Sequence, residues 1–135
     1  MYANPMASKL QSYQRTTLET HSGPELLVEL CEGAVSMVER AMDCEEPQER
    51  AHELFRARRI VVALQESLSV ELGGVIAVNL LRHYTFLSRK LLEAHQSPMD
   101  SDLELLRGKL VDLRDTWTEA VRIHTEESYA AARAS

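Results

Sequence analysis

Glu49 and His52 have the Glu-x-x-His spacing that helical bundles use to bind a pair of iron ions. Such a site needs a second Glu-x-x-His motif on another helix and one glutamate from each remaining helix. His83, His95 and His124 each follow an apolar residue three positions earlier. The sequence therefore predicts no metal site, and His52 is interpreted as a solvated or helix-capping side chain.

Other catalytic patterns are also missing from the chain. Arg56 stands where a zincin motif starting at His52 needs its second histidine, and no nucleophile elbow, phosphate-binding loop or dinucleotide-binding glycine pattern occurs. Cys31 lies inside an apolar stripe, which favours an inert buried thiol over a nucleophile. We therefore predict that the protein is not an enzyme and has no cofactor and no small-molecule substrate.

Length and composition predict one cytoplasmic all-α domain. The 135 residues are 44% hydrophobic but only 5% aromatic, with few glycines and prolines, which suits helices. The net charge of -6 disfavours binding to nucleic acid or to anionic membranes. No apolar run approaches the roughly 18 residues that span a bilayer, so we expect no membrane insertion.

Two helices are predicted in the first half of the chain. A capping box formed by Ser22 and Glu25 starts the first, and an apolar stripe runs along it from Leu26 to Met42. Pro47 opens the second helix, which we expect to end near Gly73-Gly74 because glycine suits a helix terminus. Arg56, Arg58 and Arg59 are interpreted as a solvated face that pairs with nearby glutamates.

Two more helices follow. The stretch from Gly73 to His95 is apolar on more than one face, so it predicts a central helix with surplus apolar surface. Ser101 and Glu104 form a second predicted capping box, and apolar residues then recur three and four apart from Leu103 to His124.

Four helices of roughly 20 residues, joined by short connections, predict an antiparallel up-and-down four-helix bundle. We place the bundle at residues 21–127. Residues 1–20 form a flexible or loosely docked N-terminal arm, and residues 128–135 a frayed tail. The arm and the surplus apolar surface of the central helix favour a peptide-binding protein that holds a partner's helix in a groove.

Several stretches share the order and spacing of one known family. They are Tyr13-Gln14, the residues from Thr20 to Leu27, Leu30-Cys31-Glu32-Gly33-Ala34-Val35, Gly73-Gly74-Val75-Ile76-Ala77-Val78-Asn79-Leu80, His83-Tyr84-Thr85-Phe86 and Leu113-Arg114-Asp115-Thr116-Trp117. Together they resemble the flagellin-specific export chaperones of the FliS type. The chain departs from the family pattern at Cys31, Glu32, His83 and Phe86.

The resemblance implies a cytosolic chaperone that binds the disordered C-terminal segment of flagellin, prevents premature polymerisation and helps to deliver flagellin to the flagellar type III export apparatus. Export-gate components are further expected partners. In such a protein the arm can occupy part of the binding surface, which makes Tyr13 a candidate plug. The other expected groove or groove-supporting residues are Leu26, Leu27, Asn79, Leu80, Tyr84 and Leu87. The alternative is another helical adaptor or type III secretion chaperone with a different cargo.

Overall fold

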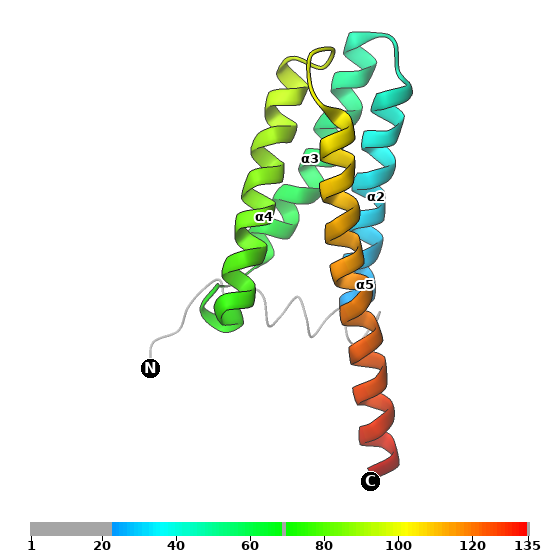
Figure 1. Ribbon diagram of the computed structural model, residues 1–135, viewed down its shortest axis with the longest axis vertical. Helices are drawn as coiled ribbons and strands as arrows, with labels where there is room; N and C mark the ends of the chain where they lie inside the picture. Colours follow the sequence, from blue (N-terminus) through cyan, green and yellow to red (C-terminus); the bar gives the residue numbers. More distant parts are fainter. Residues whose placement is uncertain (1–22, 69, 135) are drawn as a thin grey trace.

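A computed structural model describes residues 23–68 and 70–134 of the chain, and the side chains of residues 23, 24, 70–76 and 124 fall outside that description. The described residues form four α-helices and no strand: α2 (Gly23–Asp43), α3 (Pro47–Ser67), α4 (Val70–Gln96) and α5 (Leu103–Ala134). Consecutive helices run in opposite directions (Figure 1). The predicted helical bundle is confirmed; the predicted arm, with Tyr13, lies outside the described residues.

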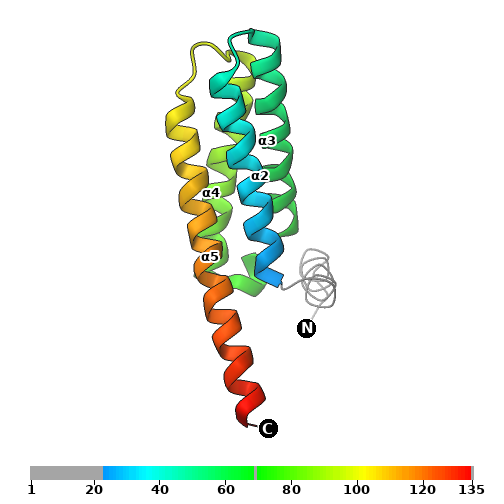
Figure 2. The same cartoon turned by 90° about the vertical axis from the view of Figure 1, so that its right-hand side faces the viewer.

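The four helices do not pack equally against one another. α2 packs along both α3 and α5, and α3 packs along α4, whereas α4 and α5 contact each other only sparingly. Figure 1 shows α4 leaning away from α5 toward its own N-terminal end, and Figure 2 shows α2 between α3 and α5. The bundle is therefore closed on three sides and loosely closed on the fourth.

A single apolar core fills the bundle, and it contains the stripes that the helical periodicity predicts. Tyr84 is the largest of its fully buried side chains. The predicted seam of α5 is buried from Leu103 to Leu113 and half-buried at Trp117 and Ala120. The buried core consists of Cys31, Ala34, Val35, Val38, Ala41, Leu54, Ala57, Val61, Leu64, Tyr84, Leu87, Leu91, Ala94, Leu103, Leu106, Leu110 and Leu113.

The start of α3 confirms the sequence prediction, whereas the start of α5 corrects it. Pro47 is the first residue of α3, and the carboxylate of Glu46 accepts a hydrogen bond from the Glu49 backbone N–H at 3.1 Å. At α5 the capping residue is Asp102, whose Oδ1 accepts from the Leu105 N–H at 3.1 Å. Ser101 instead donates its hydroxyl to the Ser97 carbonyl, because its side chain closes the preceding turn. The predicted Ser22 cap lies outside the described residues.

The predicted boundary at Gly73-Gly74 is wrong. α3 ends at Ser67, whose hydroxyl donates to the carbonyls of Ala63 and Leu64, and Leu68 adopts extended backbone angles (φ -88°, ψ 131°). α4 begins at Val70, so both glycines lie in its first two turns. Glycine lowers helix stability by about 1 kcal/mol relative to alanine but does not forbid helix, so two glycines alone do not mark a helix end.

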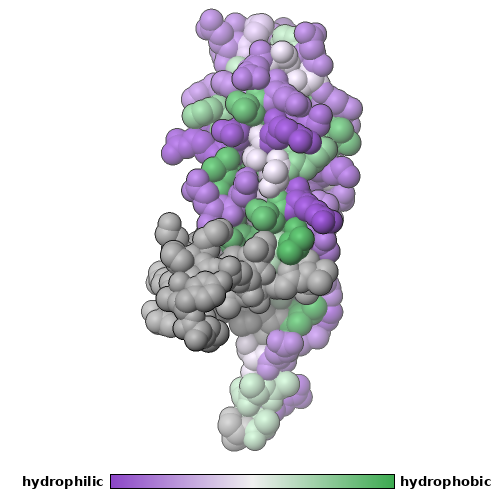
Figure 3. Space-filling model, turned by 90° about the vertical axis from the view of Figure 1, so that its left-hand side faces the viewer, coloured by the Kyte–Doolittle hydropathy of each residue, from purple (hydrophilic) through white to green (hydrophobic). Residues whose placement is uncertain are grey.

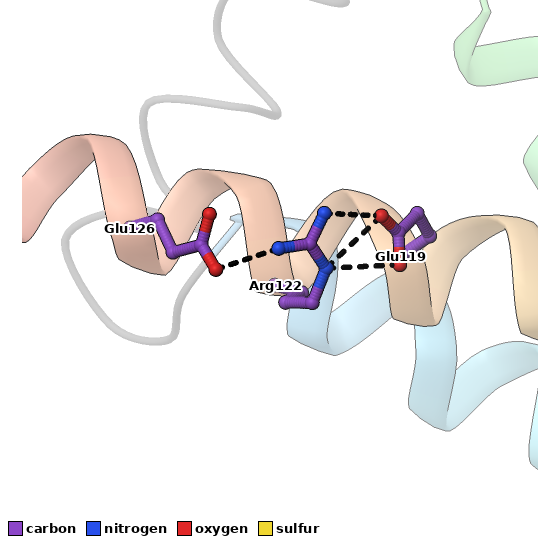
Figure 4. Close-up of polar contacts among 3 residues, drawn as sticks. All are labelled: Glu119, Arg122 and Glu126. Carbon is purple, nitrogen blue, oxygen red and sulfur yellow. Dashed lines mark hydrogen bonds and ion pairs between the residues drawn. The ribbon is translucent and has the colours of Figure 1, made fainter.

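The C-terminal part of α5 extends past the other three helices (Figures 1 and 2). Residues 128–134 are helical and exposed, and the predicted fraying of this tail stays a prediction. Arg122 holds this part together through ion pairs with Glu119 one turn earlier and Glu126 one turn later (Figure 4). The run of alanines at 130–132 adds high helix propensity to this part. None of the described helices has the length and apolarity needed to cross a membrane.

Candidate partner-binding surface

The structure separates the expected groove residues into core and surface. Tyr84 and Leu87 are each 1% exposed and belong to the core. Leu27 and Leu80 are half-buried and pack against that core, while Asn79 is exposed on α4. Leu26 is half-buried in the first turns of α2. Asn79 is therefore accessible from the surface of the folded bundle, whereas neighbouring side chains cover Tyr84 and Leu87.

Tyr84 links α4 to α5, the two neighbouring helices that pack least closely. The indole Nε1 of Trp117 on α5 donates a hydrogen bond to the Tyr84 hydroxyl at 3.1 Å. This contact satisfies polar groups that both residues bring into an apolar region. Tyr84 thereby holds α4 and α5 in register beside the surface that they share.

An open cleft lies between α4 and α5. Its volume is about 350 Å³, and we call it the α4–α5 cleft; its lining residues are Asn79, Arg82, His83, Phe86 and Lys109. Phe86 is half-buried and packs against the core, and the ammonium group of Lys90 lies 5.9 Å from the centre of its ring. The cleft thus combines an aromatic floor with exposed cationic and amide groups.

A second depression lies along α2 and α3. This α2–α3 groove measures about 310 Å³ and is lined by Leu30, Met37, Arg56, Arg59, Ile60 and Ala63. Leu30, Met37 and Ile60 are half-buried and pack against the core, so the floor is apolar. Arg56 on the rim forms an ion pair with Glu53 at 3.2 Å. An amphipathic helix with acidic flanks suits an apolar floor with an arginine rim.

The predicted arginine face of α3 is only partly a solvated face. Arg56 pairs with Glu53 as expected, but Arg58 donates its Nε to the backbone carbonyl of Ser88 on α4 at 3.1 Å. The Ser88 hydroxyl in turn donates to Gln65 on α3 and to a carbonyl on its own helix. The prediction for Arg58 is therefore wrong, because a long side chain on the edge of α3 reaches the neighbouring helix.

The outer face of α3 and α4 carries apolar side chains between charged ones (Figure 3). Among the side chains that the structure describes on these two helices, Phe55, Val78 and Leu92 are the exposed large apolar ones. The Phe55 ring lies 5.6 Å from the ring of His95, whose Nδ1 is 2.9 Å from the Ala51 carbonyl and donates to it. These side chains are spread over the face and form no groove of their own.

Two kinds of reactive group were candidates for catalysis, metal-binding side chains and the Cys31 thiol. Within residues 23–68 and 70–134, no cluster of three or more His, Cys, Asp or Glu side chains is arranged to hold a metal ion. Cys31 is fully buried, and burial raises the pKa of its thiol to about 12, so the nucleophilic thiolate is strongly disfavoured. This outcome agrees with the interpretation of Cys31 as a core residue.

Comparison with known proteins gives the family. A sequence model of the family described as "Flagellar protein FliS" matches residues 6–124. The chain belongs to the FliS family. A curated relative, the flagellar secretion chaperone FliSB of Pseudomonas aeruginosa, is 28% identical over 115 residues, which cover 80% of this chain and 91% of the relative. Membership places this FliS protein among flagellar secretion chaperones, a family of binding proteins rather than of enzymes.

Several residues of the two depressions were not among the expected site residues. Arg82 and Lys109 line the α4–α5 cleft, and Met37 and Ile60 line the α2–α3 groove. Each depression combines residues of two helices, so no local motif marks it. Met37 did offer a signal, because it follows Leu30 by seven positions, the repeat that returns to the same helical face.

Proposed function

We propose that this FliS protein is a cytosolic export chaperone that binds the disordered C-terminal segment of flagellin, prevents its premature polymerisation and helps to deliver it to the flagellar type III export apparatus. Family membership and the name of the Pseudomonas relative support the chaperone class. The observation that carries the proposal is the α2–α3 groove, an open depression with an apolar floor between two helices of a packed bundle.

The energetics of binding a disordered segment favour a helical bound state. Ordering each residue of the segment costs about 1–2 kcal/mol of backbone entropy, and burying one large apolar side chain returns about 1.5–3 kcal/mol. A segment therefore gains when it places apolar side chains three and four residues apart along one helical face. Leu30, Met37 and Ile60 provide a partly exposed apolar surface for such a face.

The expected site residues divide into two roles in this proposal. Asn79 contacts cargo directly from the α4–α5 cleft, and Leu26 does so from the first turns of α2. Leu27, Leu80, Tyr84 and Leu87 support the surface from the core side. Tyr13 remains a proposed plug that cargo displaces, and export-gate components remain proposed partners of the loaded chaperone.

Isothermal titration with a peptide covering the last helical segment of flagellin from the same organism tests the proposal. We expect saturable one-to-one binding with a negative heat-capacity change, because apolar surface is buried when the peptide orders. A scrambled peptide of the same composition is the control. Absence of binding by protein shown to be folded contradicts the flagellin assignment and favours the alternative, a helical adaptor or secretion chaperone with another cargo.

A matched pair of variants locates the binding site. Met37→Lys introduces a charge into the groove, while Ser36→Lys introduces the same charge on the exposed neighbouring position. The lysine stem can cover the same core surface as the methionine, so both variants should fold. We expect Met37→Lys to weaken binding at least about tenfold and Ser36→Lys to leave it within about twofold. Equal losses in the two variants would remove the groove from the binding site.

A further inference from the structure

The α4–α5 cleft carries cationic side chains that lack an acidic partner. Arg82 on α4 and Lys109 on α5 are both exposed, and neither forms an ion pair or hydrogen bond with another residue that the structure describes. Arg107, only two positions before Lys109, pairs with Glu39 at 3.0 Å and with Glu104 at 3.3 Å. The cleft therefore carries positive charge without an acidic partner among the described residues, although the chain as a whole has a net charge of -6.

The cleft also offers an apolar contact beside these charges. Phe86 forms its floor, and Asn79 adds an amide that can donate and accept hydrogen bonds. The nearest acidic residue along α5 is Asp112, which is exposed three positions after Lys109 and forms no ion pair with a described residue. Arg82 and Lys109 project from different helices, so a group seated between them meets positive charge from two sides.

We propose that the α4–α5 cleft selects a segment of the cargo in which an aspartate or glutamate stands next to a large apolar side chain. The carboxylate lies between Arg82 and Lys109, with Asn79 as a further hydrogen-bond donor, and the apolar side chain packs on Phe86. This inference rests on the proposed function and names the chemistry that the cleft recognises in the cargo.

Charge selection at the cleft acts over short range. The chain as a whole is acidic, so it repels an acidic cargo segment at a distance. At physiological ionic strength, exposed charges separated by more than about 8 Å are largely screened, which leaves the contacts within the cleft to decide the preference. Arg82 and Lys109 therefore contribute specificity for the bound register more than speed of association.

Charge reversal tests the proposal directly. Arg82→Glu and Lys109→Glu are compared with Arg40→Glu, which makes the same change in net charge on an exposed position of α2 outside the cleft. The probe is the flagellin C-terminal peptide, titrated at low and at physiological salt. We expect each cleft reversal to weaken binding about tenfold at low salt and less at physiological salt, with Arg40→Glu within about twofold of the wild type.

The outcomes separate this inference from the proposed function. If wild-type protein does not bind the peptide, both the proposed function and the cleft assignment are overturned. If the wild type binds and the cleft reversals weaken binding no more than Arg40→Glu does, the cleft assignment alone is overturned. All three substituted residues are exposed, so circular dichroism is expected to show unchanged folding in every variant.

Peptide variants then identify the carboxylate that the cleft holds. Each acidic residue of the peptide is replaced in turn by its amide, and binding is measured with wild type and with Lys109→Glu. Neutralising the seated carboxylate weakens binding to the wild type more than binding to Lys109→Glu, because in the variant the same neutralisation also relieves the repulsion that the introduced negative charge creates. Additive losses for every acidic position would refute a carboxylate seated beside Lys109.

Discussion

The hydrogen bond between Trp117 and Tyr84 is the specific link between the two least closely packed helices of the bundle. Tyr84→Phe keeps the buried ring in place and removes only the hydroxyl that accepts from the indole N–H at 3.1 Å. The aromatic ring is unchanged, so the loss of stability comes from the interactions of the hydroxyl. Trp117 is half-buried, which lets water replace part of the lost interaction.

The expected magnitude follows from this geometry. A neutral intramolecular hydrogen bond contributes about 0.5–1.5 kcal/mol to stability, and partial access of water to the indole argues against a larger cost. We expect Tyr84→Phe to lower the free energy of unfolding by about 1 kcal/mol. With a urea m-value of about 2 kcal/mol/M, the unfolding midpoint falls by about 0.5 M.

Urea denaturation with two probes measures this effect. Trp117 is the only tryptophan of the chain, so its fluorescence reports on this contact, and circular dichroism reports on the whole bundle. Tyr84→Phe, Trp117→Phe and the double variant form a cycle that removes any effect of the Tyr84 hydroxyl not involving Trp117. Circular dichroism follows all four proteins of this cycle, whereas fluorescence follows only the wild type and Tyr84→Phe, which keep Trp117. We expect a coupling energy of about 0.5–1.5 kcal/mol. A coupling below about 0.3 kcal/mol, the usual error of such cycles, would refute the reasoning.

Two further predictions concern single positions. A β-carbon at Gly108 would meet no atom within 4 Å, so Gly108→Ala should raise the free energy of unfolding by about 0.5–1 kcal/mol, seen as a higher urea midpoint; an unchanged midpoint would contradict this. Burial raises the pKa of the Cys31 thiol from 9.0 to about 12. Between these pH values only the unfolded chain releases the thiol proton, so stability should fall as pH rises through this window. In urea melts at several alkaline pH values, the free energy of unfolding of Cys31→Ala should fall less steeply with pH than that of the wild type. Identical pH dependences would disprove the linkage.

The sequence predicted the fold because apolar residues recur three and four positions apart along the helices, most clearly on α2 and α5. The stripe on α2 and the seam on α5 placed Cys31, Val38 and Leu110 in the core without any tertiary information. Boundaries were less predictable where two signals compete over a few residues. Asp102 and Ser101 are both good capping residues, and the turn geometry selects Asp102.

The candidate site was harder to predict than the fold. Helical periodicity shows which residues share a face, but it does not show whether a neighbouring helix or solvent covers that face. Tyr84 and Asn79 both lie in the apolar central helix, and only the packing of α5 buries the first and leaves the second open. Lys109 belongs to the cleft because α5 passes near Phe86, a relation between residues 23 positions apart that no local pattern contains.

The uneven packing of the bundle gives the proposed binding a physical rationale. Three pairs of neighbouring helices, α2 with α3, α2 with α5 and α3 with α4, pack closely. The fourth pair, α4 with α5, makes far fewer contacts, so the α4–α5 edge is the weakest edge of the bundle. A cargo segment in the α4–α5 cleft touches both helices of that edge and supplies contacts that the chain itself lacks. Because a ligand that binds only the folded state stabilises it by mass action, bound cargo strengthens the edge that is weakest without it.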